Sequence, residues 1–215
     1  MGLITMKTAD WQGYRHKDTG VLVYYDADET SALPVRATVG SKGKSANADP
    51  NYESGTYGLY SCTASPHRTK FVKNKLGYIF FMTKYQGTDV KMKDKVVVTG
   101  YYRIGSVADV RNLHLRHLED NSCFAEKNCY ALRSNVGENG ENEMFFVSYD
   151  DAFLLNPAAL KSLEIDKKIT KAAKIELDED KTKKLLKKFE GKENKVAEYI
   201  SQTAELAEAS VSVSA

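Results

Sequence analysis

The sequence predicts an α+β fold, in which a small, strongly curved mixed β-sheet or barrel carries flanking helices and a C-terminal helical appendage. Short β-branched and aromatic runs indicate about six strands in the first part of the chain. Twenty of the 22 aromatic residues and all seven arginines lie in residues 1–154. Residues 155–215 instead hold 12 lysines, 11 acidic residues and no arginine. We therefore expect an aromatic-rich β-domain over 1–154 and a Lys/Glu-rich helical tail over 155–215.

The length and charge of the chain exclude several classes of protein. Its 215 residues can bury a real core, and its formal charge of +2 lacks the broad basic field of a nonspecific nucleic-acid binder. The longest apolar run, Tyr78–Met82, is too short to cross a bilayer, so we expect no membrane partner. The first residues lack the apolar core of a signal peptide, which favours a cytoplasmic protein. Three cysteines do not make a disulfide framework.

Turn residues and β-branched runs place the first elements. Val21–Tyr25 is typical of a short strand, and Pro34–Gly40 alternates as a second, weaker strand. Ser41–Tyr60 is rich in Gly, Ser, Asn, Asp and Pro, which predicts a long loop or a set of turns. The tyrosines of this loop argue against plain disorder, because disordered segments are poor in aromatic residues.

Two stronger strands follow the loop. Gly77–Tyr85 is apolar on both faces near its middle, which predicts a central strand. Lys95–Ile104 comes after a short polar connection, so the two strands are expected to form a hairpin. Gly100 indicates a bulge, or a point where another part of the chain approaches closely.

The next segments are a short helix and a second hairpin. Val107–Leu118 has a partly helical spacing of apolar residues. Asn139-Gly140 is a strong turn signal between two expected strands, Cys129–Ser134 and Glu143–Tyr149.

The tail contains clear signals for three helices. Asn156-Pro157 supplies an N-cap and a proline at the first helical position, for a helix ending near Glu164. Acidic residues open a second helix at Asp178, and Gly191 is suited to end it. A third helix is expected over Lys192–Ala209, with one narrow apolar stripe.

Four potential zinc ligands lie within a short part of the chain. They are His114, His117, Cys123 and Cys129. Four such ligands could close a tetrahedral site, but their spacing lacks the usual C-x2-C pair. Isolated packing or surface residues explain them more simply. We therefore expect no metal and no cofactor.

Aromatic residues mixed with basic and hydroxyl residues are the most informative pattern. Side chains alternate across a strand, so in Phe80-Phe81 and Tyr101-Tyr102 one ring of each pair should enter the core and the other should face outward or into a cleft. Nucleic-acid bases stack on such rings, while Arg and Lys hold phosphates. The segment His67–Lys75 carries five basic side chains, His67 included, and no acidic one. Ordinary packing of a sheet is the alternative explanation for the rings.

These motifs resemble a known superfamily. The elements are Asp49-Pro50-Asn51, Thr56-Tyr57-Gly58, Gly77-Tyr78-Ile79-Phe80-Phe81 and Gly100-Tyr101-Tyr102-Arg103-Ile104. In this order they resemble the PUA-like superfamily, and specifically the nucleotide-modification-associated domains, which are relatives of the ASCH, EVE and YTH domains. The match covers roughly residues 34–150. It implies a strongly curved β-barrel flanked by helices, and a pocket for a nucleobase, often a modified one, in DNA or RNA.

The pattern and the resemblance together predict a nucleic-acid-binding module that recognises a base, modified or flipped out of its stack, in a pocket. The expected stacking or wall residues are Tyr57, Tyr60, Phe81 and Tyr101 or Tyr102. The expected hydrogen-bonding residues are Asn51, Ser61 and Thr83. The expected phosphate contacts are Arg68, Lys70, Lys73 and Arg103.

Two other functions stay open. The first is an enzyme that acts on modified nucleotides or nucleic acid, which would need a polar catalytic pair beside the pocket. The second is a protein-interaction module whose helical tail docks a partner or a second copy of the chain. The sequence leaves open the choice between DNA and RNA, the base or modification, and the oligomeric state.

Overall fold

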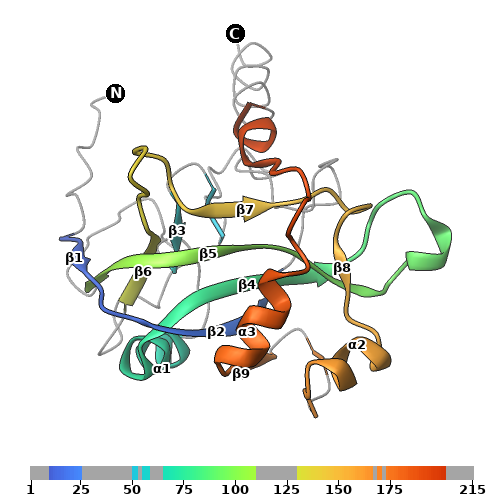
Figure 1. Ribbon diagram of the computed structural model, residues 1–215, viewed down its shortest axis with the longest axis horizontal. Helices are drawn as coiled ribbons and strands as arrows, with labels where there is room; N and C mark the ends of the chain where they lie inside the picture. The colour runs from blue at the N-terminus through green and yellow to red at the C-terminus, as the bar shows by residue number, and fades with distance from the viewer. Residues whose placement is uncertain are drawn as a thin grey trace, which may run out of the picture.

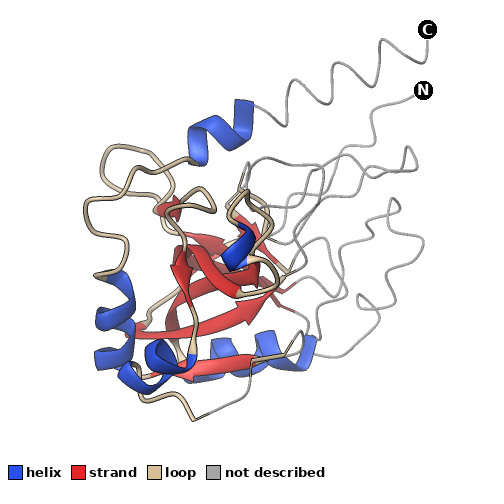
Figure 2. Ribbon diagram, turned by 90° about the vertical axis from the view of Figure 1, so that its right-hand side faces the viewer, coloured by secondary structure: helices blue, strands red, loops and turns tan. Residues whose placement is uncertain are grey.

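The structure is a computed structural model that describes residues 10–25, 50–52, 55–58, 65–109, 130–166, 169–170 and 173–201. It is an α+β fold with one mixed, largely antiparallel sheet and a few helices around it (Figure 1). Figure 2 shows the helices placed around the outside of the strands. The described strands follow the order β3-β6-β5-β4-β2-β9 and do not close into a barrel.

The middle of the sheet is a parallel pair. β2 (Lys17–Tyr24) runs beside β4 (Leu76–Lys84), and α1 (Ser65–Asn74) leads directly into β4. β4 also pairs with β5 (Val96–Asp109) through an antiparallel hairpin whose loop holds the short helix η1 (Val90–Met92). The predicted central strand is therefore confirmed, because β4 has a neighbour on each edge.

β5 is the longest strand and organises the rest of the sheet. One of its edges carries β4 and then β1 (Gln12–Gly13). The other edge carries three short strands in succession, which are β8 (Phe153–Leu154), β7 (Met144–Phe146) and β6 (Tyr130–Ser134). β3 (Thr56–Tyr57) pairs with the outer edge of β6. The turn expected at Asn139-Gly140 is present, with Gly140 at φ 82°, and it connects β6 to β7. Among the described residues, the expected hairpin is limited to one bridge between Val136 and Asn142, because β6 and β7 each pair with β5 and not with each other.

Gly100 is the point of close approach that its sequence position predicts. A Cβ atom there would lie 2.1 Å from the carbonyl oxygen of Phe145 on the neighbouring strand. The register of β4 against β5 also shifts next to it, between Phe81 and Met82. A residue without a side chain is required here so that β7 can pair with β5.

The prediction of a helix over 107–118 is wrong for its first three residues. Val107, Ala108 and Asp109 continue β5 as a strand and pair with β6. Ladder bonds to β6 satisfy their backbone groups, which outweighs the weak helical spacing of the apolar residues. Residues 110–118 lie outside the described residues, as does the weaker strand expected at Pro34–Gly40.

The sheet has an apolar layer on each face. Alternation along β4 sends Ile79 and Phe81 to one layer, and Phe80 and Met82 to the other. The sequence predicts that one ring of Phe80-Phe81 faces outward or into a cleft, but both rings are fully buried. Phe80 is covered because its layer packs against the tail, including Leu185 of α3 (Glu179–Leu186).

The described part of the tail supplies a strand as well as helices. α2 (Pro157–Ser162) is capped by Asn156, and α3 (Glu179–Leu186) is capped by Asp178, which confirms two predicted helices. β9 (Lys174–Leu177) was not expected from sequence, and it pairs antiparallel with β2. Its Ile175 and Leu177 alternate into the core, which explains why so short a segment holds as an edge strand.

The third tail helix is described only at its start. Residues 196–201 are helical, and the remainder lies outside the described residues. Tyr199 is buried against the aromatic ring of Tyr52, with the ring centroids 5.6 Å apart. No helix among the described residues is long and apolar enough to cross a membrane.

Candidate aromatic groove

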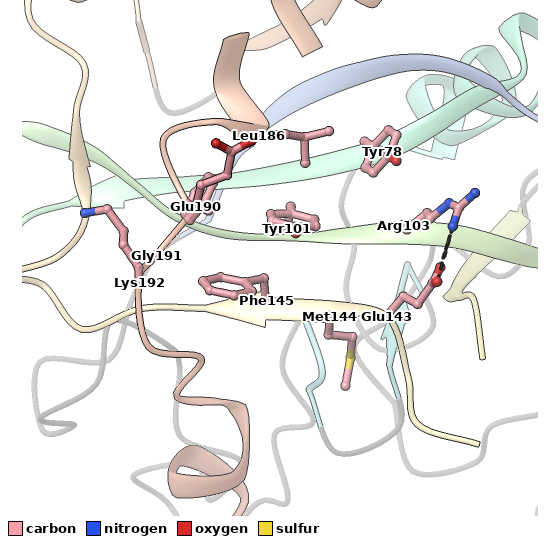
Figure 3. A pocket seen from close by; sticks show the side chains of 11 residues that line it. Tyr78, Tyr101, Arg103, Glu143, Met144, Phe145, Leu186, Glu190, Gly191 and Lys192 are labelled. Carbon is pink, nitrogen blue, oxygen red and sulfur yellow. Dashed lines mark hydrogen bonds and ion pairs between the residues drawn. The ribbon is translucent and has the colours of Figure 1, made fainter. Parts of the chain in front are cut away.

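A groove opens between the outer face of the sheet and the segment that follows α3 (Figure 3). Its volume is about 560 Å³. We call it the aromatic groove, and it is lined by Tyr78, Tyr101, Arg103, Glu143, Met144, Phe145, Leu186, Phe189, Glu190, Gly191 and Lys192. The lining residues come from β4, β5, β7 and the tail, so the groove exists only when the tail is docked on the sheet.

The rings on the floor come from three adjacent strands. Tyr101 of β5 is the direct cross-strand partner of Phe145 of β7, and Tyr78 of β4 lies diagonally across from Tyr101. The rings of Tyr101 and Phe145 are stacked, with centroids 5.7 Å apart and planes inclined by 5°. The Tyr78 ring stands 6.2 Å from that of Tyr101 at 63°. These rings share one face because cross-strand partners and i, i+2 neighbours point the same way.

The tail closes one side of the groove with Phe189. Its ring meets Tyr101 at 5.4 Å and Phe145 at 5.7 Å, edge-on in both cases. Phe189 is buried, whereas Tyr101 and Phe145 are only partly covered. Phe189 therefore packs against the two rings, which keep part of their surface exposed.

An ion pair holds one end of the groove. Nη1 of Arg103 donates to both carboxylate oxygens of Glu143 at 3.2 Å, and Nδ2 of Asn135 donates to Oε2 at 2.8 Å. The two backbones are also joined, since the Arg103 N–H donates to the Glu143 carbonyl at 3.0 Å. Nε of Arg103 is buried without an acceptor among the described residues. This end therefore presents a carboxylate acceptor beside a guanidinium whose Nη2 makes no hydrogen bond within the described ranges.

The opposite end holds Glu190 and Lys192. Figure 3 shows the Lys192 side chain extending away from the rings, and its Nζ donates to the backbone carbonyl of Asp151. The groove thus contains two cationic and two anionic side chains, whose formal charges cancel. Burial raises the pKa of the Tyr78 and Tyr101 hydroxyls further above an ordinary value at which tyrosine is already neutral at pH 7.

Two of the residues predicted from sequence meet in this groove. They are Tyr101, expected to stack on a base, and Arg103, expected to contact phosphate. They lie on one face of β5 because they are two residues apart. Arg103, however, already has a carboxylate partner.

The other predicted stacking residues lie on the opposite face of the sheet. Tyr57, Phe81 and Tyr102 meet there as a group, with 4.7 Å between the Phe81 and Tyr102 ring centroids. All three are buried, as are the predicted hydrogen-bonding residues Asn51 and Thr83. The structure therefore places these five residues in or beside the core layer on the far side from the aromatic groove.

The predicted phosphate contacts on α1 have different surroundings. Arg68 is 1% exposed, and its Nε donates to the carbonyl of Tyr130 at 2.6 Å. Lys70 is exposed and forms an ion pair with Glu176 of β9 at 2.6 Å. Lys73 is exposed on the same helix. The buried guanidinium of Arg68 ties α1 to β6 in this conformation.

The remaining candidates fall outside the described residues. They are Tyr60, Ser61, His114, His117, Cys123 and Cys129. Within the described ranges, no three His, Cys, Asp or Glu side chains gather closely enough to hold a metal ion.

Several groove residues were not predicted from sequence. Tyr78 and Phe145 could have been found, because strand alternation and cross-strand pairing place them on the face of Tyr101. Glu143 could have been paired with Arg103 by the same reasoning. Phe189 carries no such signal, because its position depends on how the tail docks onto the sheet.

Comparisons with known proteins find no relative: no family model matches the chain, and neither a curated protein nor a solved structure matches it. Any function must therefore be argued from the residues of the groove.

Proposed function

We propose that this protein is a nucleic-acid-binding module and that the aromatic groove receives one unstacked base. The proposal rests on the stacked rings of Tyr101 and Phe145, which line the groove and are partly exposed. The Arg103–Glu143 ion pair lies beside them. The likeness of the sequence motifs to PUA-like domains supports the same class of ligand.

The shape and apolar floor of the groove suit a flat heterocycle. Stacking of a base on an aromatic side chain contributes about 1–3 kcal/mol. A volume of about 560 Å³ lies within the usual range of small-molecule sites and leaves room for a nucleoside. A ring lying on Tyr101 and Phe145 would have Tyr78 at its side, because Tyr78 stands at 63° to Tyr101.

The polar end of the groove suits the edge of a base. Every base carries both donors and acceptors on its edge, and Glu143 accepts while Arg103 donates. Because the formal charges of the groove cancel, the groove favours a neutral base over a phosphate group. Recognition of a base, modified or unmodified, is therefore the activity that this geometry supports best.

The test is a titration of labelled single-stranded DNA and RNA, with modified and unmodified bases, against the wild type and two variants. Tyr101→Leu removes the ring, and Tyr101→Phe keeps the ring while removing the hydroxyl. We expect Tyr101→Leu to weaken binding about tenfold, by the loss of one stacking contact. Tyr101→Phe should bind within about twofold of the wild type, because it retains the stacking surface.

Two results would overturn the proposal. One is the absence of binding to every oligonucleotide at low salt by folded protein. The other is equal binding by folded Tyr101→Leu and wild-type protein, which would place the bound base elsewhere. Circular dichroism of each variant establishes that it is folded before the titration.

A further inference from the structure

The C-terminal half of α3 and the turn after it carry an unusual concentration of positive charge. Lys183, Lys184, Lys187 and Lys188 form two pairs of lysines spaced four residues apart. Like charges at this spacing on a helix destabilise it by a few tenths of a kcal/mol per pair. Lysines near a helix C-terminus gain from the dipole, but this gain needs only one or two of them.

The four lysines divide between two sides of the helix. Successive residues turn by about 100°, and the buried Thr182 and Leu185 mark the side that faces the sheet. Lys183 and Lys187 lie on the side toward which Leu186, a groove residue, is turned. Lys184 and Lys188 lie on the opposite side.

Among the residues that the structure describes, partners are found only for the lysines on the side away from the groove. Nζ of Lys184 forms an ion pair with Glu164 at 3.1 Å, and Nζ of Lys188 lies 5.2 Å from the centre of the Phe153 ring. Phe153 belongs to β8, which pairs with β5 at Val97 and Val98, before the groove residues of β5 begin. These two lysines therefore stabilise the packing of α3 against β8 and the turn that follows α2.

Lys183 and Lys187 are exposed and have no acidic partner among the described residues. Glu179, one turn before Lys183, forms no ion pair with it within the described part of the chain. The cations inside the groove are already engaged, Arg103 by Glu143 and Lys192 by the Asp151 carbonyl. Within the described ranges, the positive charge beside the groove that has no acidic partner is thus on these two lysines.

We propose that Lys183 and Lys187 bind two phosphates of the nucleic-acid strand whose base enters the aromatic groove. This inference rests on the proposed function and assigns the path of the backbone. The strand crosses the outer surface of α3, and one nucleotide turns past Leu186 into the groove. The groove would then hold the base, and α3 with the turn after it would hold the phosphates. This division explains why the charges inside the groove cancel while Lys183 and Lys187 have no acidic partner within the described residues.

The experiment compares two double variants that change the net charge equally on one helix. Lys183→Gln/Lys187→Gln removes the proposed contacts, and Lys184→Gln/Lys188→Gln is the matched control on the other side. Binding of a labelled oligothymidylate of about ten nucleotides is measured between about 50 and 200 mM salt. Thermal unfolding of both variants establishes that they are folded.

The expected result is a difference in salt dependence. Each phosphate contact on a single strand adds about 0.7 to the slope of log affinity against log salt. The slope of Lys183→Gln/Lys187→Gln should therefore be smaller by about 1.4 than that of the wild type. Over this salt range, wild-type affinity would fall about sevenfold more than that of the variant. The control variant should keep the wild-type slope.

Other outcomes overturn the inference and leave the proposed function standing. These are equal changes in slope for the two double variants, no change in either, or displacement of the oligonucleotide by polyglutamate at equal charge. In each of these cases the loss of binding by Tyr101→Leu would still support a base in the groove. Absence of oligonucleotide binding by the wild type overturns both proposals, so the two failures are distinguishable.

Discussion

Tyr101 and Phe145 are cross-strand partners on β5 and β7 whose rings lie parallel at a centroid distance of 5.7 Å. The Phe189 ring packs against both rings at 65° and 64°, and the Arg103–Glu143 ion pair lies at the same groove. Edge-to-face packing dominates the core on the other side of the sheet, where Phe81 and Tyr102 meet at 74°. The stacked pair lines the aromatic groove, where another flat ring can pack against it.

Replacing Glu143 by glutamine should strengthen binding of single strands and reduce base discrimination. The substitution removes the charge that neutralises Arg103, and with it the repulsion of a nearby phosphate. One such charge at about 5 Å in water corresponds to about a fourfold gain in affinity at low salt. The side chains of the pair are 40% and 32% exposed, so the stability of the protein should change by less than about 1 kcal/mol.

Anisotropy titrations at low salt against two or more base compositions measure this effect. Glu138→Gln, an exposed glutamate in the turn between β6 and β7, is the control for a general change in charge. Equal tightening by the two variants would show that Glu143 has no special position relative to the ligand.

Replacing Leu185 by alanine tests whether the tail is part of the cooperative fold. Leu185 is fully buried in the apolar layer that includes Phe80 and Ile175. Its truncation should lower the free energy of unfolding by about 2–5 kcal/mol, as expected for a large-to-small change in a core. Denaturant unfolding followed by circular dichroism measures the loss.

Leu186→Ala is the natural comparison, because the neighbouring side chain is only half-buried at the groove. It should cost clearly less stability than Leu185→Ala. A tail that unfolds separately from the sheet would instead show a second transition, which Leu185→Ala shifts while the main one stays in place.

The cap of α3 should make stability depend on pH in acid. The side chain of Lys181 donates to Asp178 at 2.7 Å and its backbone N–H donates at 2.9 Å, and these bonds hold the pKa of the Asp178 carboxyl below its usual value. The resulting stability is fully present above the unfolded-state pKa of about 3.9, and is lost as pH falls through the lower folded-state pKa.

Asp178→Ala should therefore cost about 0.5–2 kcal/mol at pH 7 and progressively less below about pH 4. Asn156→Ala removes the equivalent cap of α2, where Oδ1 accepts from the Ala159 N–H at 2.8 Å. The cost of Asn156→Ala should not vary with pH in this range, because an amide does not titrate. Unfolding curves at several pH values distinguish the two, and parallel behaviour would contradict the electrostatic account of Asp178.

Sequence signals predicted an element correctly where residues within that element are enough to stabilise it. The β-branched and aromatic runs mark β2, β4 and β5, and the apolar middle of β4 identifies it as central. The caps Asn156 and Asp178 begin helices where expected. β9 was missed because four alternating residues are too few to separate a strand from a loop before a partner strand is known.

The site was predictable only in part. Spacing by two along β5 puts Tyr101 and Arg103 on one face, which the sequence alone can show. The same alternation puts Tyr102 on the other face, but it does not reveal which face remains open. That choice depends on what covers each layer, and the tail covers Phe80 while leaving Tyr101 partly exposed.

The sequence alone predicts the strands β2, β4, β5, β6 and β7, the helix caps, the glycine where β7 pairs with β5, and the alternation of aromatic residues. These features follow from local sterics and short-range hydrogen bonds, which act within a few residues. Three features follow from the packing of distant segments instead: β9 joins the sheet, Phe189 packs against Tyr101 and Phe145, and Arg103 meets Glu143 beside them. The physical reason is that burial of apolar surface is non-directional. It requires the tail to cover an apolar face of the sheet, but only the packed side chains select which residues meet.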